Sequence, residues 1–427
     1  MRHGSMKGIL PTAGWVMVGL ALAVSLGLDL ANTSQGGAVD LRNRITGVRL
    51  LERGIDVYHY KWREGEPPEY IDLRNNPHLP VSKTTVTPAL LMLHLPFAAL
   101  PYRLTQFLWL FGQWLMLLGT GWLWWRACTT PLKGWLVALF VTAFSYTQAW
   151  RWEAERGQAY LLLSFLFTCW LTATMGSKRG NGFVAGCVAG FLIALRPPFI
   201  LLLPFLALHR RGQLIGATAG LLLGFGPPLL MSPSCWTDYF SAMQTYSDLY
   251  RHGFNAGPNP LKYPPTIEGM STDLLGHLMP FHTGDFSAHA FLRWLGFAPF
   301  SALPVLFVVV APFAAWLWVS RRQPAERLLP ALAAWFFLVD LFLPAIRFSY
   351  HDVFILNVVL AGVITAKKFP WAVWPCALAL PLGWAVYAFW PAAPWVINLP
   401  AFFFTLGAIL FLFSFTSGTT GERGEAK

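Results

Sequence analysis

Long apolar stretches alternate with short polar loops along most of this 427-residue chain. Many of the stretches approach the ~20 residues that an α-helix needs to cross a bilayer. A water-soluble fold has no way to bury so many apolar faces. Composition agrees, because 55% of the residues are hydrophobic and only 12% are charged, against ~25% in soluble domains. The pattern predicts an all-α, polytopic bundle of transmembrane helices.

Basic residues predict the orientation of this bundle. Paired basic residues occupy the short loops at Lys178-Arg179, Arg210-Arg211, Arg321-Arg322 and Lys367-Lys368. The positive-inside rule places these loops and both termini in the cytoplasm if the number of crossings is even. We expect about twelve spans in the cell inner (plasma) membrane, the first over residues 9–28 as an uncleaved anchor. The net charge of +11 is dispersed, so no nucleic-acid partner is implied.

One membrane domain is expected over residues 1–416, followed by a disordered cytoplasmic tail over residues 417–427. Two long loops, about 31–84 and 232–289, fall on the outer face. Long loops on a rigid scaffold are where binding and catalytic groups commonly lie. The five cysteines lack metal-ligand spacing, so the sequence predicts neither a metal site nor a disulfide framework.

The first long loop contains an amphipathic pattern that ends at an acidic residue. Apolar residues recur there mostly every three or four positions, at Val39, Leu41, Ile45, Val48, Leu51 and Ile55. This spacing predicts a helix in the membrane interface, apolar side down, with Asp56 at its end. A base for a lipid-borne substrate would lie there, although a carboxylate that only caps the loop is the alternative. Tyr58, with Tyr60 and Trp62, would either stack on a sugar ring or anchor the interface.

Arg196-Pro197-Pro198 interrupts an apolar stretch over residues 183–208. The interruption predicts two short helices that meet at Arg196, which membranes tolerate where they face protein or a wet cavity. Arg196 would either bind a phosphate through its planar fork or pair with a carboxylate such as Asp340. Asp340 lies inside a later apolar span, and Arg347 and His351 lie at its outer end and the start of the next span. They would bind a phosphate, with His351 also able to assist proton transfer, or would form a helix-end cluster wetted by the interface.

The order of these motifs resembles a known family of membrane enzymes. The similar segments are Asp56-x-Tyr58 followed by residues 65–70, Gly157-Gln158-Ala159-Tyr160, Arg196-Pro197-Pro198 and Ser349-Tyr350-His351-Asp352. Together they resemble glycosyltransferase family 87, a GT-C-type group, across most of the chain. The chain departs from the family where the second span begins, because Thr85-Val86-Thr87-Pro88 stands in place of a Tyr-Pro-Pro-like motif.

The resemblance implies a metal-independent hexosyltransferase without a cofactor. Such an enzyme moves a sugar, often mannose, from a polyprenyl-phosphate carrier to a glycolipid or glycan acceptor. The transfer takes place at the outer face of the membrane, and the protein contacts membrane lipids throughout. Asp56 takes the place of the base in the first outer loop, and one base suffices for an inverting displacement. The residues expected to bind the donor phosphate or the substrate are Arg196, His351, Arg347, Tyr58 and Gln158.

A transporter or lipid flippase is the rival interpretation from another class. Broken helices and intramembrane charges suit transport as well as catalysis. The second half of the sequence has no duplicate of the broken segment, which counts against the common inverted-repeat transporters. A scaffold subunit of an envelope assembly is a third interpretation, in which Asp56 and Arg196 would be replaceable.

Overall fold

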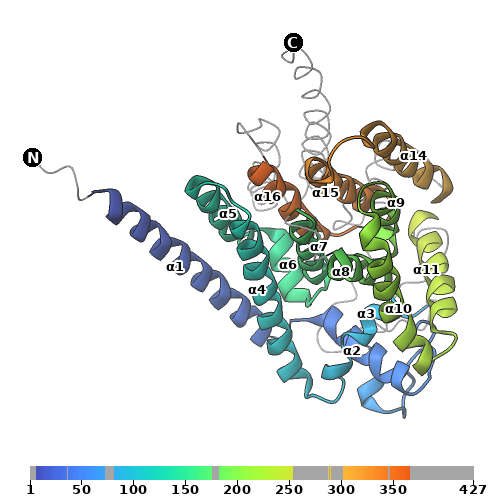
Figure 1. The fold of residues 1–427 in the computed structure, drawn as a ribbon. Coiled ribbons are helices and arrows are strands. Elements are labelled where there is room, and N and C mark those ends of the chain that lie inside the picture. The colour runs from blue at the N-terminus through green and yellow to red at the C-terminus, as the bar shows by residue number, and fades with distance from the viewer. Residues whose placement is uncertain are drawn as a thin grey trace, which may run out of the picture.

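The computed structural model describes residues 6–35, 37–72, 81–175, 182–252, 287, 289, 302–344 and 347–365. Every regular element within these ranges is a helix, which confirms the all-α prediction. Most of the helices pack side by side in a bundle, and α1 extends away from it at one side (Figure 1).

The helices follow one another closely in the chain. The first part contains α1 (Met6–Ser34), α2 (Val39–Glu52), η1 (Pro68–Tyr70), α3 (Pro88–Met92), η2 (Leu95–Phe97), α4 (Tyr102–Arg126), α5 (Pro131–Phe144), α6 (Gln148–Arg156) and α7 (Tyr160–Met175). The remainder contains α8 (Gly182–Leu195), η3 (Pro197–Leu201), α9 (Leu202–His209), η4 (Arg211–Gln213), α10 (Leu214–Met231), α11 (Cys235–His252), α14 (Ala302–Ser320), α15 (Ala325–Phe342), η5 (Ser349–Phe354) and α16 (Ile355–Thr365). Thr87 and Thr130 begin α3 and α5 as side-chain caps, each followed by a proline that has no N–H to leave unpaired.

Few of the described helices are long enough to cross a membrane unaided. Two segments have the required length and hydropathy, Thr12–Ser34 and Arg211–Met231. α6 and α7 meet the same test together but bend by 114°, so they form a broken span or a re-entrant loop. Gly157 ends α6 in the left-handed conformation, with φ 63°, that a helix end commonly requires. A membrane protein is supported, whereas the count of about twelve crossings remains a prediction.

α8 and α10 pack so closely that their backbones touch. The glycines that face one another are Gly186 and Gly190 on α8 and Gly216 and Gly220 on α10. A Cβ atom at Gly190 would lie 1.9 Å from the carbonyl oxygen of Ala217, and one at Gly220 would lie 2.0 Å from that of Cys187. Small residues allow this approach in apolar surroundings, where close packing holds helices together. The contact fixes the direction of α8 and hence the position of Arg196 beyond its end.

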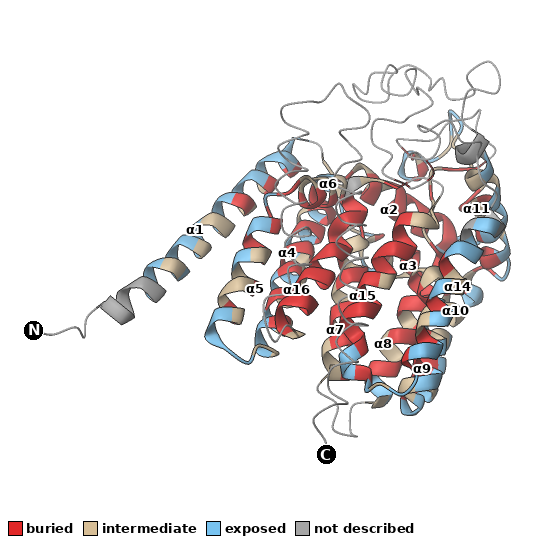
Figure 2. Cartoon of the chain, turned by 90° about the horizontal axis from the view of Figure 1, so that it is seen from above, coloured by how far each residue is buried: buried red, intermediate tan, exposed pale blue. Residues whose placement is uncertain are grey.

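Buried polar contacts hold α1 to the bundle near its C-terminal end. Much of α1 is exposed, as Figure 2 shows, and several of the exposed side chains are large and apolar. Asp29, by contrast, is buried and accepts hydrogen bonds from the indole N–H groups of Trp114 (3.0 Å) and Trp150 (2.8 Å). Its carboxylate also pairs with Arg151. Because a buried carboxylate needs such donors, this contact anchors α1 against α4 and α6.

α2 is the helix expected in the first outer loop, but its surroundings differ from the expectation. An interfacial helix would keep its polar side in water. Glu52 and Arg53 are indeed exposed, but Arg44 is buried, together with Asp40 and Asn43. Arg44 and Asp40 face the α6–α7 turn, which supplies their hydrogen-bond partners from a distant part of the sequence. Periodicity identified the helix, whereas its partners depend on the tertiary fold.

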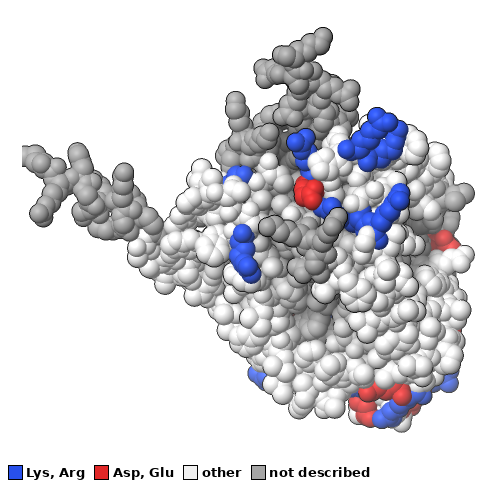
Figure 3. Space-filling model, in the orientation of Figure 1, with Lys and Arg blue, Asp and Glu red and all other residues white. Residues whose placement is uncertain are grey.

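The basic loops within the described ranges gather at one end of the bundle. Arg210, after α9, donates to the carbonyl oxygen of Thr174 at the end of α7 (3.3 Å) and pairs with Glu326 at the start of α15. Lys133, at the start of α5, donates to the carbonyl oxygen of Ile364 near the end of α16 (2.6 Å). Charged side chains gather toward two ends of the face in Figure 3, with few between them. Because these helices alternate in direction, the start of α7 and the ends of α8 and α15 lie toward the opposite end.

Several predicted features lie outside the described residues. They are residues 253–286 of the second outer loop, the basic pairs at 178–179 and 367–368, and the tail over 417–427. The single domain over residues 1–416 therefore stays a prediction. The described beginning of the second loop forms α11, a helix that the sequence analysis did not identify.

Candidate functional site

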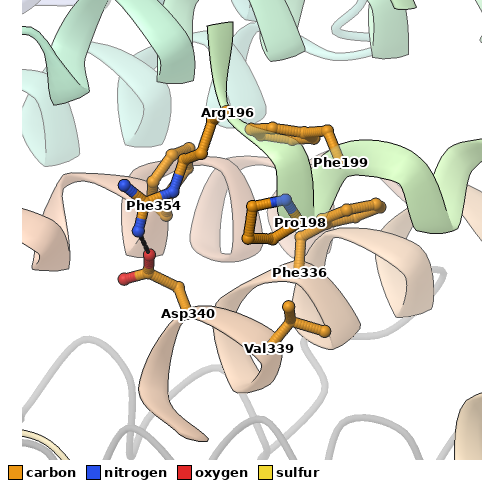
Figure 4. A pocket seen from close by; sticks show the side chains of 7 residues that line it. All are labelled: Arg196, Pro198, Phe199, Phe336, Val339, Asp340 and Phe354. Carbon is orange, nitrogen blue, oxygen red and sulfur yellow. Dashed lines mark hydrogen bonds and ion pairs between the residues drawn. The ribbon is translucent and has the colours of Figure 1, made fainter. Parts of the chain in front are cut away.

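The chain breaks between α8 and α9 at Arg196, as the sequence predicts. α8 ends at Leu195, Arg196 is extended with φ −149° and ψ 102°, and η3 begins at Pro197. A residue before proline is driven out of the helical region, so the break follows from local sterics. The guanidinium of Arg196 contacts the carboxylate of Asp340 on α15 (Figure 4). Of the two roles left open for Arg196, the pairing with Asp340 is thus present in the structure.

Asp340 is the centre of a cluster of charged side chains. Its Oδ1 atom accepts a hydrogen bond from Arg196, and its Oδ2 atom lies 3.2 Å from both Nε of Arg347 and Nδ1 of His351. Arg347 also pairs with Asp352 at 2.6 Å. Buried charges need such pairing, because desolvation would otherwise cost several kcal/mol per ion. The cluster brings together the three residues predicted to bind phosphate.

Tyr160, at the start of α7, joins this cluster through its ring. The ring stacks on the imidazole of His351 with the centroids 4.0 Å apart. The guanidinium carbon of Arg196 lies 4.7 Å from the same ring, within the range of a cation–π attraction. Tyr160 therefore holds Arg196 and His351 beside one another.

A small pocket lies next to the Arg196–Asp340 pair. The other residues that line it are Pro198, Phe199, Phe336, Val339 and Phe354 (Figure 4). Its volume is about 10 Å³, which is roughly the space of one water molecule. A sugar phosphate is larger than this space, so the pocket by itself does not outline a substrate site.

Asp56, the predicted base, lies in a turn just after α2. Its Oδ1 atom accepts hydrogen bonds from the backbone N–H groups of Tyr58 (3.0 Å) and His59 (3.3 Å), as in an Asx turn. Its Oδ2 atom lies 2.7 Å from Nδ1 of His59, and the Asp56 side chain is 41% exposed. One oxygen thus caps the turn, as the alternative interpretation expects, and the other contacts His59, while the side chain stays partly exposed.

Tyr58 is buried beneath the Asp56 turn. Its hydroxyl donates to the carbonyl oxygen of Val86 (2.9 Å), and its ring meets that of Tyr239 on α11 edge to face at 5.5 Å. Burial, with a smaller effect of Tyr239, raises the pKa of Tyr58 well above its usual range, so the phenol remains a donor. Tyr58 holds the loop in place, and its predicted contact with substrate stays a prediction.

A second hydrogen bond connects this loop to the Arg196 break. Thr87, next to Val86, donates from its hydroxyl to the carbonyl oxygen of Leu195 (3.0 Å). The same hydroxyl accepts from the N–H of Leu90 as the cap of α3 (3.2 Å). Both the Asp56 turn and Arg196 are therefore attached to the two residues that precede α3. Tyr58 attaches the turn to Val86, and Leu195, next to Arg196, is bonded to Thr87.

Gln158 lies in the α6–α7 turn with its amide engaged by two residues of α2. Its Oε1 atom accepts from Arg44, and its Nε2 group donates to Asp40. Arg156 pairs with the same Asp40 at 2.6 Å. Gln158 is 4% exposed, so its polar atoms face protein in this structure. Its predicted role in substrate binding is not tested by these contacts.

Residues 85–344, more than half of the chain, match the sequence model of glycosyltransferase family 87. The chain belongs to glycosyltransferase family 87. It is therefore an enzyme of the glycosyltransferase class, as its motifs indicate. None of the curated proteins and none of the solved structures matches it.

The matched segment covers only part of the predicted site. It contains Gln158 and Arg196, whereas Asp56 precedes it and both Arg347 and His351 follow it. Family membership thus establishes the reaction class. The roles of the individual residues stay predictions.

Sequence reasoning assigned no role to Arg44 or Tyr239. Arg44 falls on the polar side of the predicted interfacial helix, and that pattern does not indicate its buried partners Gly157 and Gln158. Tyr239 belongs to a three- and four-residue spacing of apolar positions, Trp236, Tyr239, Met243 and Tyr246, which pack against the core. This spacing is the signal of an amphipathic helix that the analysis of the second loop passed over.

The described residues contain no group of three or more His, Cys, Asp or Glu side chains that could hold a metal ion. Metal independence itself remains a prediction.

We expect Gln158→Leu to lower the stability of the protein. The change removes one buried partner from both Arg44 and Asp40, at about 1–3 kcal/mol for each polar group left unsatisfied. Thermal unfolding in detergent micelles measures the effect. Glu155→Gln, on the exposed side of α6, is the matched control and should unfold like the wild type. An unchanged unfolding temperature with a raised KM would instead identify Gln158 as a substrate ligand.

Proposed function

We propose that this glycosyltransferase moves a hexose, in the first place mannose, from a polyprenyl-phosphate carrier to a hydroxyl group of a glycolipid or glycan. The reaction takes place at the outer face of the plasma membrane, with both chain termini in the cytoplasm. It inverts the anomeric centre and uses neither a metal ion nor a cofactor. The motif resemblance and the membership of family 87 support this donor class.

Asp56 acts as the general base in this proposal. Its carboxylate takes the proton of the acceptor hydroxyl while that oxygen forms a bond to the anomeric carbon. The bond from this carbon to the phosphate oxygen breaks on the opposite face, and its electron pair leaves with the polyprenyl phosphate. Arg196, supported by His351 and Arg347, stabilises the negative charge that develops. No second carboxylate is needed, because direct displacement forms no glycosyl-enzyme intermediate.

The observation that carries the proposal is the connection between an accessible carboxylate and an arginine at a helix break. Tyr58 attaches the Asp56 turn to Val86, and the neighbouring Thr87 attaches to the last residue of α8. A base and a phosphate-binding group that act on one sugar must lie on neighbouring segments. Tyr58 and Gln158 are proposed to shape the site at its edges.

Reconstitution with a panel of donors tests the proposed function. Proteoliposomes that contain the wild-type protein should transfer label from a polyprenyl-phosphate sugar to a lipid-linked acceptor, and EDTA should not reduce the rate. The anomeric configuration of the product, determined by NMR, should be opposite to that of the donor. Transfer from nucleotide sugars alone, or loss of transfer in EDTA, would contradict the proposed donor class or the metal-free mechanism.

A further inference from the structure

Among the described residues, each arginine in the cluster around Asp340 already has an acidic partner. Arg196 pairs with Asp340, and Arg347 contacts both Asp340 and Asp352. His351 contributes a charge only when it is protonated. Two guanidinium groups thus face two carboxylates. Arg196 already has Asp340 as its anionic partner. To bind a phosphate, its guanidinium must therefore either contact both anions or leave Asp340.

Arg196 is the member of this cluster that can reach a ligand. Its side chain is 17% exposed, whereas Arg347 is fully buried and Asp340 is 5% exposed. Arg196 also lines the pocket of Figure 4, where one of its terminal nitrogens is directed at Asp340 and the other lies away from it. The guanidinium shares a further hydrogen bond with the neutral side chain of Tyr160, so Asp340 is its charged partner. A planar fork of this kind can serve one anion on each side, or pass from one to the other.

We propose that Asp340 is a positioning residue that holds Arg196 between reaction cycles and competes with polyprenyl phosphate for it. Carboxylates and phosphates offer similar pairs of oxygens to a guanidinium fork. The inference rests on the proposed function, because it requires a lipid-phosphate donor.

The competition between Asp340 and phosphate for Arg196 matters because the charge of the phosphate changes during the reaction. The phosphodiester of the donor carries one negative charge, whereas the released monoester carries about 1.5 to 2 at neutral pH. The product therefore binds Arg196 more tightly than the donor does. When the product leaves, Arg196 pairs with Asp340 again. This pairing replaces the lost contact with phosphate and so speeds product release.

Binding of polyprenyl phosphate to the purified full-length protein in detergent micelles tests the proposal without requiring transfer. Asp340→Asn keeps the size of the side chain and removes its charge. We expect the Kd of this variant to fall by about tenfold, since one charged competitor is lost. In transfer assays the same variant should show a burst followed by slow turnover, because product release becomes limiting. A folded Asp340→Asn protein that binds polyprenyl phosphate equally or more weakly overturns the proposal, since a purely structural Asp340 gives that result.

Asp352→Asn is the matched control. It removes one negative charge from the same cluster, but from the side of Arg347, which is fully buried. Its Kd should stay within about twofold of the wild-type value, because Arg196 keeps its partner. Equal tightening in both variants would point to the net charge of the cluster and would overturn a specific role of Asp340.

Arg196→Gln provides a second route if Asp340→Asn does not fold. This variant leaves Asp340 with Arg347 and His351 as partners. We expect its binding of polyprenyl phosphate to weaken by at least about tenfold, and unchanged binding would overturn the proposal. Wild-type protein that does not bind polyprenyl phosphate at all would also overturn it. Wild-type transfer from a lipid-linked donor, without tighter binding in Asp340→Asn, would leave the proposed function standing and remove this inference alone.

Discussion

Asp56→Asn is expected to lower the rate of sugar transfer by about 10²–10⁴-fold, the contribution typical of a general base. Asparagine has nearly the same size, and its Oδ1 atom can still accept from the backbone N–H groups of Tyr58 and His59. The turn after α2 should therefore persist. The amide has no carboxylate to take the acceptor proton, so the loss should fall on kcat with the unfolding temperature unchanged.

Initial rates in proteoliposomes measure this effect with the donor that the wild-type protein uses. Glu64→Gln is the control, because Glu64 is an exposed carboxylate in the same loop. It should transfer sugar at the wild-type rate. Full activity in a folded Asp56→Asn protein would exclude Asp56 as the base and direct the search to the acidic residues of the second outer loop.

Gly220→Ala is expected to disrupt the packing of α8 against α10. The added Cβ atom would lie 2.0 Å from the carbonyl oxygen of Cys187 and 2.8 Å from the backbone nitrogen of Phe191. These are backbone atoms, so no side chain can rotate away, and the helices must separate by roughly 1 Å or more. We expect a loss of about 3 kcal/mol or more, at the upper end of overpacking effects. The displacement would also reach Arg196 beyond the end of α8.

Gly112→Ala on α4 is the matched control for this prediction. It places the same methyl group in a helix interior where, apart from the adjoining residues and the helix's own backbone, no atom lies within 4 Å of the added carbon. Its midpoint of thermal unfolding in detergent should equal or slightly exceed that of the wild type, because alanine favours a helix over glycine. Equal midpoints for the two variants would mean that the α8–α10 contact is looser than the structure indicates.

Arg196 and Asp56, the two parts of the proposed site, differ in how many contacts fix their positions. Arg196 follows a helix that is fixed by backbone contact with α10, and its guanidinium is paired with Asp340 and lies against Tyr160. Asp56 lies in a half-buried turn that is held by the hydroxyl of Tyr58 and by hydrogen bonds from Ser82. A preorganised cation suits the developing charge of a leaving phosphate. An accessible carboxylate suits an acceptor that arrives separately.

The sequence by itself determined the features that depend on local chemistry. Hydropathy established the helical membrane class, the spacing of apolar residues located α2 with Asp56 just beyond its end, and Arg196-Pro197-Pro198 marked the break after α8. The motif order indicated the family. Each of these follows from the polarity of a segment or from the steric limits of its backbone.

Only the tertiary structure decided which polar groups meet. Arg196 and Asp340 are 144 positions apart, and the sequence offered Arg196 a phosphate or a carboxylate without choosing between them. Gln158 and Arg44 are partners because α2 packs against the α6–α7 turn, a contact that the periodicity of α2 does not indicate. A buried charge pairs with whichever opposite charge the packing brings within reach, and packing is a property of the whole chain. Local patterns therefore predicted the helices and the break, whereas the partners of the buried charges required the fold.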